Sequence, residues 1–176
     1  MSLIRKLGLE LQKEYNKILR KLTNIKGTPE SIAKGFATGV AMSFTPFVGF
    51  HILLSLMVVK ITKQNGVAAV LGTIAGNPWT FPFIWYLTLH TGYLVLPNQN
   101  SLSPLDFKLF FSKLFHAIIS LDFNLFIHDI WPIFLPMLIG CIPYYILVWF
   151  VVSYLIKKAI IKPQINGERH DIRPRL

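Results

Sequence analysis

The sequence predicts an all-α integral membrane protein in which broken or re-entrant helices pack with spanning helices, after an N-terminal amphipathic helix. Two observations predict this class. Residues 35–59, 66–96 and 131–156 are apolar and carry no charged side chain, and each is longer than the roughly 20 residues that a spanning helix needs. Proline and small residues nevertheless interrupt the first two segments, so each of these segments contains a break.

Composition and charge placement agree with this class. The 176 residues are 53% hydrophobic, and the mean hydropathy is +0.51. The net charge of +10 comes from both ends of the chain, since eight of the 18 basic residues lie in residues 1–34 and six follow residue 156. Basic residues beside membrane segments mark the cytoplasmic side and attract anionic lipid head groups. No recognisable nucleic-acid module accompanies them, so we expect membrane lipids as partners and no nucleic acid.

Residues 1–28 are predicted to form a basic amphipathic helix. From Ile4 to Leu22, apolar residues recur at steps of three and four, and basic side chains fill much of the remaining surface. Two placements remain open: the helix lies on the cytoplasmic membrane surface, or it is cytosolic and packs on the domain or on a partner. Thr28 and Pro29 then predict a capped helix start, with the proline at the first helical position.

The predicted membrane domain, residues 29–160, opens with two similar segments. Each carries small residues at steps of four, which let another helix approach closely. These residues are Gly35, Gly39 and Ser43 in the first segment and Ala68, Gly72 and Gly76 in the second. A polar residue and a proline follow, as Thr45-Pro46 and Asn77-Pro78. The pattern resembles the duplicated broken helices of transporters, and the alternative is two closely packed helices kinked at proline.

The remainder is predicted to comprise an interfacial or outer-side segment, a span and a tail. Residues 97–130 begin with a polar turn and a helix start at Ser103-Pro104, and their few basic residues favour the outer side. The apolar segment 131–156 is a candidate span that ends at Lys157. Residues 161–176 form a polar, basic tail.

The placement of charge also predicts a topology. Three plain spans would put the two basic ends on opposite sides of the membrane, and this conflict disappears if one segment enters and leaves by the same face. Lys60 and Lys63 favour a cytoplasmic connector, so residues 35–59 are predicted to be re-entrant. Each arm would hold about 10 residues, or about 15 Å, and would reach the middle of a bilayer. We therefore expect a multi-pass protein with both termini in the cytoplasm.

Residues for acid–base chemistry are scarce. All eight acidic residues lie outside the three apolar segments, so these segments hold no carboxylate pair for catalysis or for a hard metal ion. Cys141 is the single cysteine, which excludes an internal disulfide and a second thiol ligand. We expect no catalytic residue, no metal and no cofactor, and an intramembrane enzyme remains as a third hypothesis behind the two given below. His51 and His90 remain as ionisable groups, either as ligand or proton sites or as partners of freed carbonyls.

The breaks supply the candidate ligand-binding residues. These are Asn77 and Thr80 at the second break, Thr45 and His51 at the first, and Lys34 at the edge of the segment, with the backbone broken at Pro46, Gly49, Gly76 and Pro78. A helix that begins after a break presents free N–H groups, which suit an anion such as phosphate or carboxylate. The alternative is that the Asn77 and Thr80 side chains only satisfy backbone groups that proline leaves unpaired.

Three stretches also resemble a known family. They are Lys34-Gly35-Phe36-Ala37-Thr38-Gly39, Pro46-Phe47-Val48-Gly49-Phe50-His51 and Gly76-Asn77-Pro78-Trp79-Thr80. Together they resemble the bacterial membrane family called domain of unknown function 2062, over about residues 25–155. The resemblance implies a small protein of the bacterial inner membrane. It implies no activity and supplies no catalytic residues.

Two functions from different classes fit these observations. The first is a small transporter or flippase for an anionic solute or a lipid-linked phosphate, with its site at the helix breaks. The alternative is a membrane scaffold or assembly partner that acts through its basic N-terminal helix and has neither transport nor catalytic activity. Because 176 residues are few for a complete transport path, we also expect a homo-oligomer.

Overall fold

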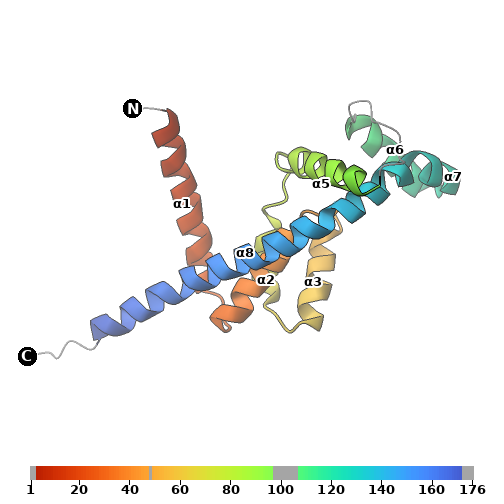
Figure 1. Cartoon of the computed structure of the whole chain (residues 1–176). Helices are drawn as coiled ribbons and strands as arrows, with labels where there is room; N and C mark the ends of the chain where they lie inside the picture. Colours follow the sequence, from red (N-terminus) through yellow and green to blue (C-terminus); the bar gives the residue numbers. More distant parts are fainter. Residues whose placement is uncertain (1–2, 48, 97–106, 172–176) are drawn as a thin grey trace, which may run out of the picture.

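Helices account for every regular element in the part of the chain that the computed structural model describes, residues 3–47, 49–96 and 107–171 (Figure 1). They are α1 (Leu3–Thr23), α2 (Pro29–Met42), α3 (His51–Ile61), α4 (Gly66–Thr73), α5 (Phe81–Val95), α6 (Phe107–Ser120), α7 (Phe123–Leu125), the π-helix η1 (Phe126–Ile130) and α8 (Trp131–Asp171). The predicted all-α class is confirmed for these residues. The helix start at Ser103-Pro104 and the turn before it lie outside them.

Both expected breaks divide their segments into separate helices. The first separates α2 from α3 and contains Gly49, whose φ of 81° is a left-handed conformation that glycine adopts at little cost. The second separates α4 from α5. The resulting helices have 14, 11, 8 and 15 residues, each shorter than the roughly 20 that a bilayer crossing needs.

One continuous helical stretch, Phe123–Ile161, is long and apolar enough to cross a membrane by length and composition, with a mean hydropathy of 2.1 over an 18-residue window. No other helix in the described residues reaches that length and apolarity. Many large apolar side chains of this stretch are exposed, including Ile146, Leu147 and Phe150. These features support association with a membrane.

Helix α8 is the axis of the molecule, and α2 and α5 pack on it one after the other (Figure 1). Glu30 at the start of α2 pairs with Lys157, and the Phe44 ring beyond its end stacks on Tyr144 at 6.2 Å. The α5 contact lies further toward the start of α8, where a Cβ on Gly92 would overlap the Pro136 carbonyl. Both α2 and α5 therefore run antiparallel to α8.

The two predicted stripes of small residues pack against each other. A Cβ on Gly39 would overlap the Ala69 carbonyl of α4, and a Cβ on Gly72 would overlap the Phe36 carbonyl of α2. Further along, a Cβ on Gly76 would lie 2.6 Å from the Ser43 hydroxyl. Contacts advance together along both helices, so α2 and α4 are parallel and their backbones nearly touch.

Helix α3 returns the chain to the start of α2. The Asn65 backbone N–H donates to the Ser31 carbonyl at 3.2 Å, and the Asn65 side chain donates to the Lys26 carbonyl at 3.0 Å. The same side chain caps α4 by accepting from the Ala68 N–H at 2.9 Å. Thus α2 and α3 form a hairpin whose two ends lie together.

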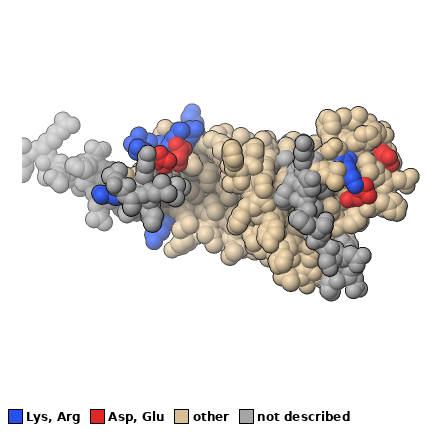
Figure 2. All heavy atoms as spheres, turned by 90° about the horizontal axis from the view of Figure 1, so that it is seen from above, with Lys and Arg blue, Asp and Glu red and all other residues tan. Residues whose placement is uncertain are grey.

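Charged side chains gather at the two ends of the bundle, with an uncharged surface between them on the face in view (Figure 2). Lys157 marks one end of this band, and Asp129, paired with Lys113 at 2.8 Å, marks the other. About 28 helical residues separate Asp129 from Lys157, which corresponds to about 40 Å. Tyr144, which stacks on Phe44 beside the first break, lies halfway along this band.

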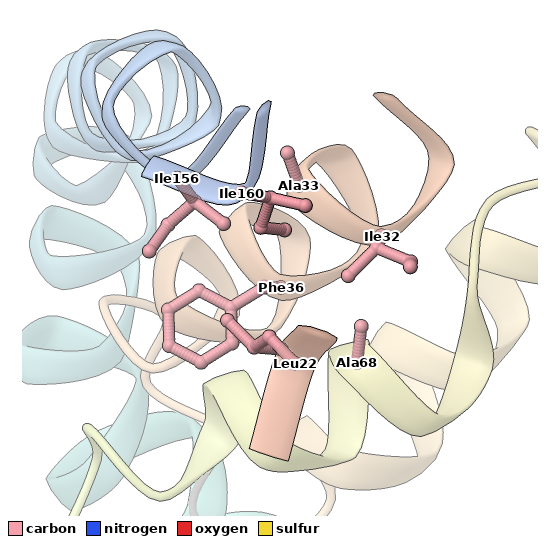
Figure 3. Packing of buried hydrophobic residues seen from close by; sticks show 7 residues of the cluster. All are labelled: Leu22, Ile32, Ala33, Phe36, Ala68, Ile156 and Ile160. Atoms are coloured by element: carbon pink, nitrogen blue, oxygen red, sulfur yellow. The ribbon is translucent and has the colours of Figure 1, made fainter. Parts of the chain in front are cut away.

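The largest core cluster joins four helices near the basic end (Figure 3). Its members are Leu22, Ile32, Ala33, Phe36, Ala68, Ile156 and Ile160. Leu22 anchors the last turn of α1 there, while the rest of α1 departs from the bundle and exposes Leu9 and Tyr15 by about half (Figure 1). The predicted cap is confirmed, because the Thr28 hydroxyl accepts from the Ser31 N–H and Pro29 opens α2.

Candidate functional site

The two helix breaks meet in the interior of the bundle. Ser43 touches Gly76 where α2 and α4 end, and the His51 ring lies edge-on to Phe81, with ring centroids 5.7 Å apart. We call this region, formed by Ser43, Thr45, His51, Gly76 and Phe81, the break junction. The structure thus brings the two breaks together, about halfway along the uncharged band.

Asn77 and Thr80 form a reciprocal cap within the second break. The Asn77 side-chain oxygen accepts from the Trp79 and Thr80 N–H groups at 3.0 and 3.1 Å. The Thr80 hydroxyl accepts from the Asn77 N–H at 3.0 Å and lies 2.8 Å from the Ala75 carbonyl. This arrangement has the logic of a capping box, and it satisfies backbone groups that the break would otherwise leave open. An anion at this helix start would compete with the Asn77 side chain.

Thr45 makes a similar local contact at the first break. Its hydroxyl donates to the Met42 carbonyl at 2.7 Å, and its side chain is buried. Pro46, which follows it, has no N–H to continue the helix, and Gly49 turns the chain. The polar groups of Thr45 are therefore used to close α2.

His51 differs from the other break residues because its ring nitrogen Nδ1 has no hydrogen-bond partner of good geometry among the described residues. The side chain is 7% exposed, and no described group hydrogen-bonds to its Nδ1 with good geometry. The Phe47 carbonyl accepts the His51 backbone N–H at 2.8 Å and also lies beside the ring. His90, by contrast, is exposed on α5 and stacks on Tyr86. His51 is therefore the group at the junction with unused hydrogen-bonding capacity.

Lys34 lies away from the break junction, in a second candidate site that we call the basic pocket. This cavity has a volume of about 470 Å³ and is formed by the start of α2, the α3–α4 connector and α8. Its lining residues are Thr28, Pro29, Glu30, Ser31, Lys34, Thr62, Lys63, Gln64, Lys157 and Ile161. Lys34 precedes Thr45 by 11 residues, or about 16 Å of helix, so one small ligand does not reach both.

Glu30 links two lysines of the basic pocket. One carboxylate oxygen lies 2.7 Å from the Lys34 ammonium, and the other lies 3.0 Å from the Lys157 ammonium. Hydrogen bonds and charge attraction from Lys34 and Lys157 lower the pKa of Glu30 from 4.5 to about 2. With Lys63, three ammonium groups face one carboxylate, and the pocket carries a net positive charge.

The sequence did not predict the hydrogen-bond network behind this pocket. Thr38 is fully buried, accepts from the Trp149 indole N–H at 3.0 Å, and lies 2.8 Å from the Gln64 side-chain oxygen. These residues are 111 and 26 positions from Thr38 along the chain, so no local spacing relates them. The sequence feature that could have pointed to this network is a single threonine among the small residues of α2.

The two sites offer different chemistry. The break junction holds neutral polar groups that mostly bond within the chain, together with the His51 ring. The basic pocket holds ammonium groups accessible to solvent, which can bind an anion. Within the described residues, no three His, Cys, Asp or Glu side chains gather closely enough to hold a metal ion.

Comparison with known proteins supports a family and no activity. No curated protein matches the chain, and no solved structure matches it either. A family model described as an uncharacterized protein conserved in bacteria matches residues 12–167. The match covers most of the chain, including both breaks and the basic pocket. The chain therefore belongs to this bacterial family of unknown function, domain of unknown function 2062.

Proposed function

We propose that the protein is a multi-pass protein of the bacterial inner membrane that transports or flips an anionic solute or a lipid-linked phosphate. The observation that carries this proposal is the meeting of two helix–break–helix units halfway along an uncharged band of about 40 Å. A broken helix at the middle of a bilayer is tolerated where protein buries it or where it lines a path. The basic pocket would collect the anion at one end of that path.

The proposed topology follows from where the helices begin and end. Because Lys34 and Lys63 line one pocket, the α2–α3 hairpin would enter and leave by the same face. Helices α4 and α5 together would cross the bilayer, and α8 would return. Both termini would then be cytoplasmic, and the α6–α7 region would lie outside.

Cysteine labelling in cells tests this topology. In a Cys141→Ser background, single cysteines replace exposed residues at Gln12, Thr62 and Asn124. With an impermeant thiol reagent, we expect labelling at position 124 in intact cells and at positions 12 and 62 only after permeabilisation. Labelling at position 62 in intact cells would make residues 35–59 an ordinary span and would remove this support for a transport path.

Transport itself is tested in proteoliposomes. The probe is phosphatidylglycerol with a fluorescent acyl chain, and dithionite bleaching reports its movement between leaflets; uptake of radioactive inorganic phosphate tests the solute alternative. We expect activity in the wild type and a large loss in His51→Phe, with His90→Phe as the matched control on the exposed side of α5. Absence of both activities from folded protein would contradict the proposal.

The scaffold alternative is favoured by one observation, the way α1 departs from the bundle (Figure 1). Lys13, Lys17, Arg20 and Lys21 line a groove on this helix, which suits anionic lipid head groups or an acidic partner. In this alternative, deletion of residues 1–26 abolishes function in cells while Asn77→Ala and Thr80→Ala are tolerated. A homodimer, which we also propose, is tested by the mass of the purified protein in detergent.

A further inference from the structure

The basic pocket is built from three parts of the chain that the fold alone brings together. Lys34 comes from α2, Lys63 from the α3–α4 connector and Lys157 from α8. Grouping three like charges is unfavourable unless something offsets the repulsion. The Glu30 carboxylate offsets part of it, because each of its oxygens binds a different lysine. An oxyanion of the chain itself thus already occupies this pocket.

Lys63 is not part of that internal pairing. Among the described residues it makes no ion pair, and its side chain is exposed. Its backbone is left-handed, with φ of 54°, in a helix ending where the Gln64 N–H donates to the Val59 carbonyl at 2.8 Å. Glycine usually fills this position, and a side chain there costs about 1 kcal/mol. This left-handed turn carries Lys63, the third lysine among the lining residues of the pocket.

The neighbouring residue fixes the connector in place. Gln64 reaches the fully buried Thr38, and Asn65 bonds to the Ser31 carbonyl, so the chain is anchored directly after Lys63. Lys34 and Lys157 are held by Glu30, with 40% and 45% of their side chains exposed. Two ammonium groups are therefore positioned by Glu30, and all three lysines are accessible to a ligand.

We infer that the basic pocket binds a phosphate group, with Lys34, Lys63 and Lys157 contacting its oxygens and Glu30 acting as an internal competitor. A phosphate monoester carries up to two negative charges and three free oxygens, one for each lysine, whereas a carboxylate carries one charge on two oxygens. The cavity, at about 470 Å³, has room for a phosphate and an attached group. The terminal phosphate of phosphatidic acid and free phosphate share this chemistry. The biological role of the pocket rests on the proposed function, whereas phosphate binding by the pocket does not depend on that function.

Calorimetric titration of the full-length protein in detergent at pH 8 tests this inference. The probes are inorganic phosphate, dihexanoyl phosphatidic acid, and acetate at equal ionic strength. We expect Lys63→Gln to weaken phosphate binding by about tenfold, the scale of a lost charged hydrogen bond. Glu30→Gln should strengthen binding several-fold because the competing carboxylate is gone. The control is Lys60→Gln, an exposed lysine of α3 that does not line the pocket.

The outcomes distinguish a lipid phosphate from free phosphate. They also distinguish the phosphate site from the transport function. Binding of both phosphate probes, or of the lipid alone, supports the site and shows whether an acyl chain is needed. Equal binding of acetate, equal weakening by Lys60→Gln, or no binding at millimolar concentration overturns it. Binding without movement of lipid or phosphate in proteoliposomes would retain the pocket and contradict the transport function. An unchanged melting temperature of Lys63→Gln excludes misfolding as the cause.

Discussion

The two helix–break–helix units use the same packing but end differently. In both, a glycine of the first helix, Gly39 or Gly72, lies against a carbonyl of the other unit. In the first unit, Gly49 takes a left-handed conformation and α3 runs back to the start of α2. In the second, residues 74–80 contain no positive φ, and the Asn77 side chain accepts from N–H groups of the turn that leads into α5, which continues along α8. The turn in the break decides whether the chain returns or continues.

The two breaks also differ in how completely their polar groups are hydrogen-bonded. The second break satisfies its own backbone through Asn77 and Thr80. The first break leaves the buried His51 ring with an unused nitrogen. A buried polar atom without a partner costs about 1–3 kcal/mol, so the folded state gains no stability from this nitrogen.

The first prediction concerns the greatest loss of stability and tests whether the two helix–break–helix units are equivalent. Gly39→Ala and Gly72→Ala each place a methyl group on a backbone carbonyl, and we expect each to cost about 1–3 kcal/mol or more. Unfolding can be followed by reaction of a fluorogenic maleimide with the buried Cys141. Gly8→Ala, which meets nothing within 4 Å, is the control and should raise stability slightly. Unequal losses from Gly39 and Gly72 would show that the units are not equivalent.

The second prediction compares the two caps. Asn77→Ala removes an acceptor for two backbone N–H groups, and we expect a loss of about 1 kcal/mol. Thr45→Val should cost less, because the Met42 carbonyl still accepts the Thr45 N–H at 3.1 Å. Both variants are measured by the same thermal assay. A larger loss of stability from Thr45→Val than from Asn77→Ala would contradict the assignment of the second break as the one whose side chains satisfy its own backbone.

The third prediction concerns the Nδ1 atom of His51. His51→Phe keeps the aromatic contact with Phe81 and removes Nδ1, so we expect unchanged stability or a gain of up to about 1 kcal/mol. His51→Ala, which leaves a cavity, should instead destabilise by about 3 kcal/mol. Transport is measured on the same preparations. A marked loss of stability in His51→Phe would mean that Nδ1 has a partner.

The smallest effect is the pH dependence of the Glu30 pairs. Because the folded state lowers the pKa of Glu30 from 4.5 to about 2, its stabilising contribution is complete above about pH 4.5. It is lost as the pH falls from there toward 2. The difference in melting temperature between wild type and Glu30→Gln should stay constant from pH 8 to 5 and shrink below. A difference that changes between pH 6 and 8 would implicate another group.

Much of the fold follows from local sequence rules. The cap formed by Thr28 and Pro29 and the breaks at Pro46 and Pro78 depend on dihedral and hydrogen-bond preferences that act over a few residues. The small-residue stripes were predicted as surfaces for close helix approach, and their packing confirms this. The ligand roles of Asn77, Thr80, Thr45, His51 and Lys34 stay predictions. For Asn77 and Thr80, the structure shows bonds of the structural alternative.

The helix breaks and the uncharged band could be predicted from the order of residues, because proline, glycine spacing and charge placement act on neighbouring residues. Three features come from the folded arrangement instead: the two stripes pack on each other, His51 meets Phe81, and three distant lysines share one pocket. Those pairings depend on the direction of the chain after each break. That direction is set by backbone geometry at Gly49 and by packing along α8, which the spacing of residue types does not encode.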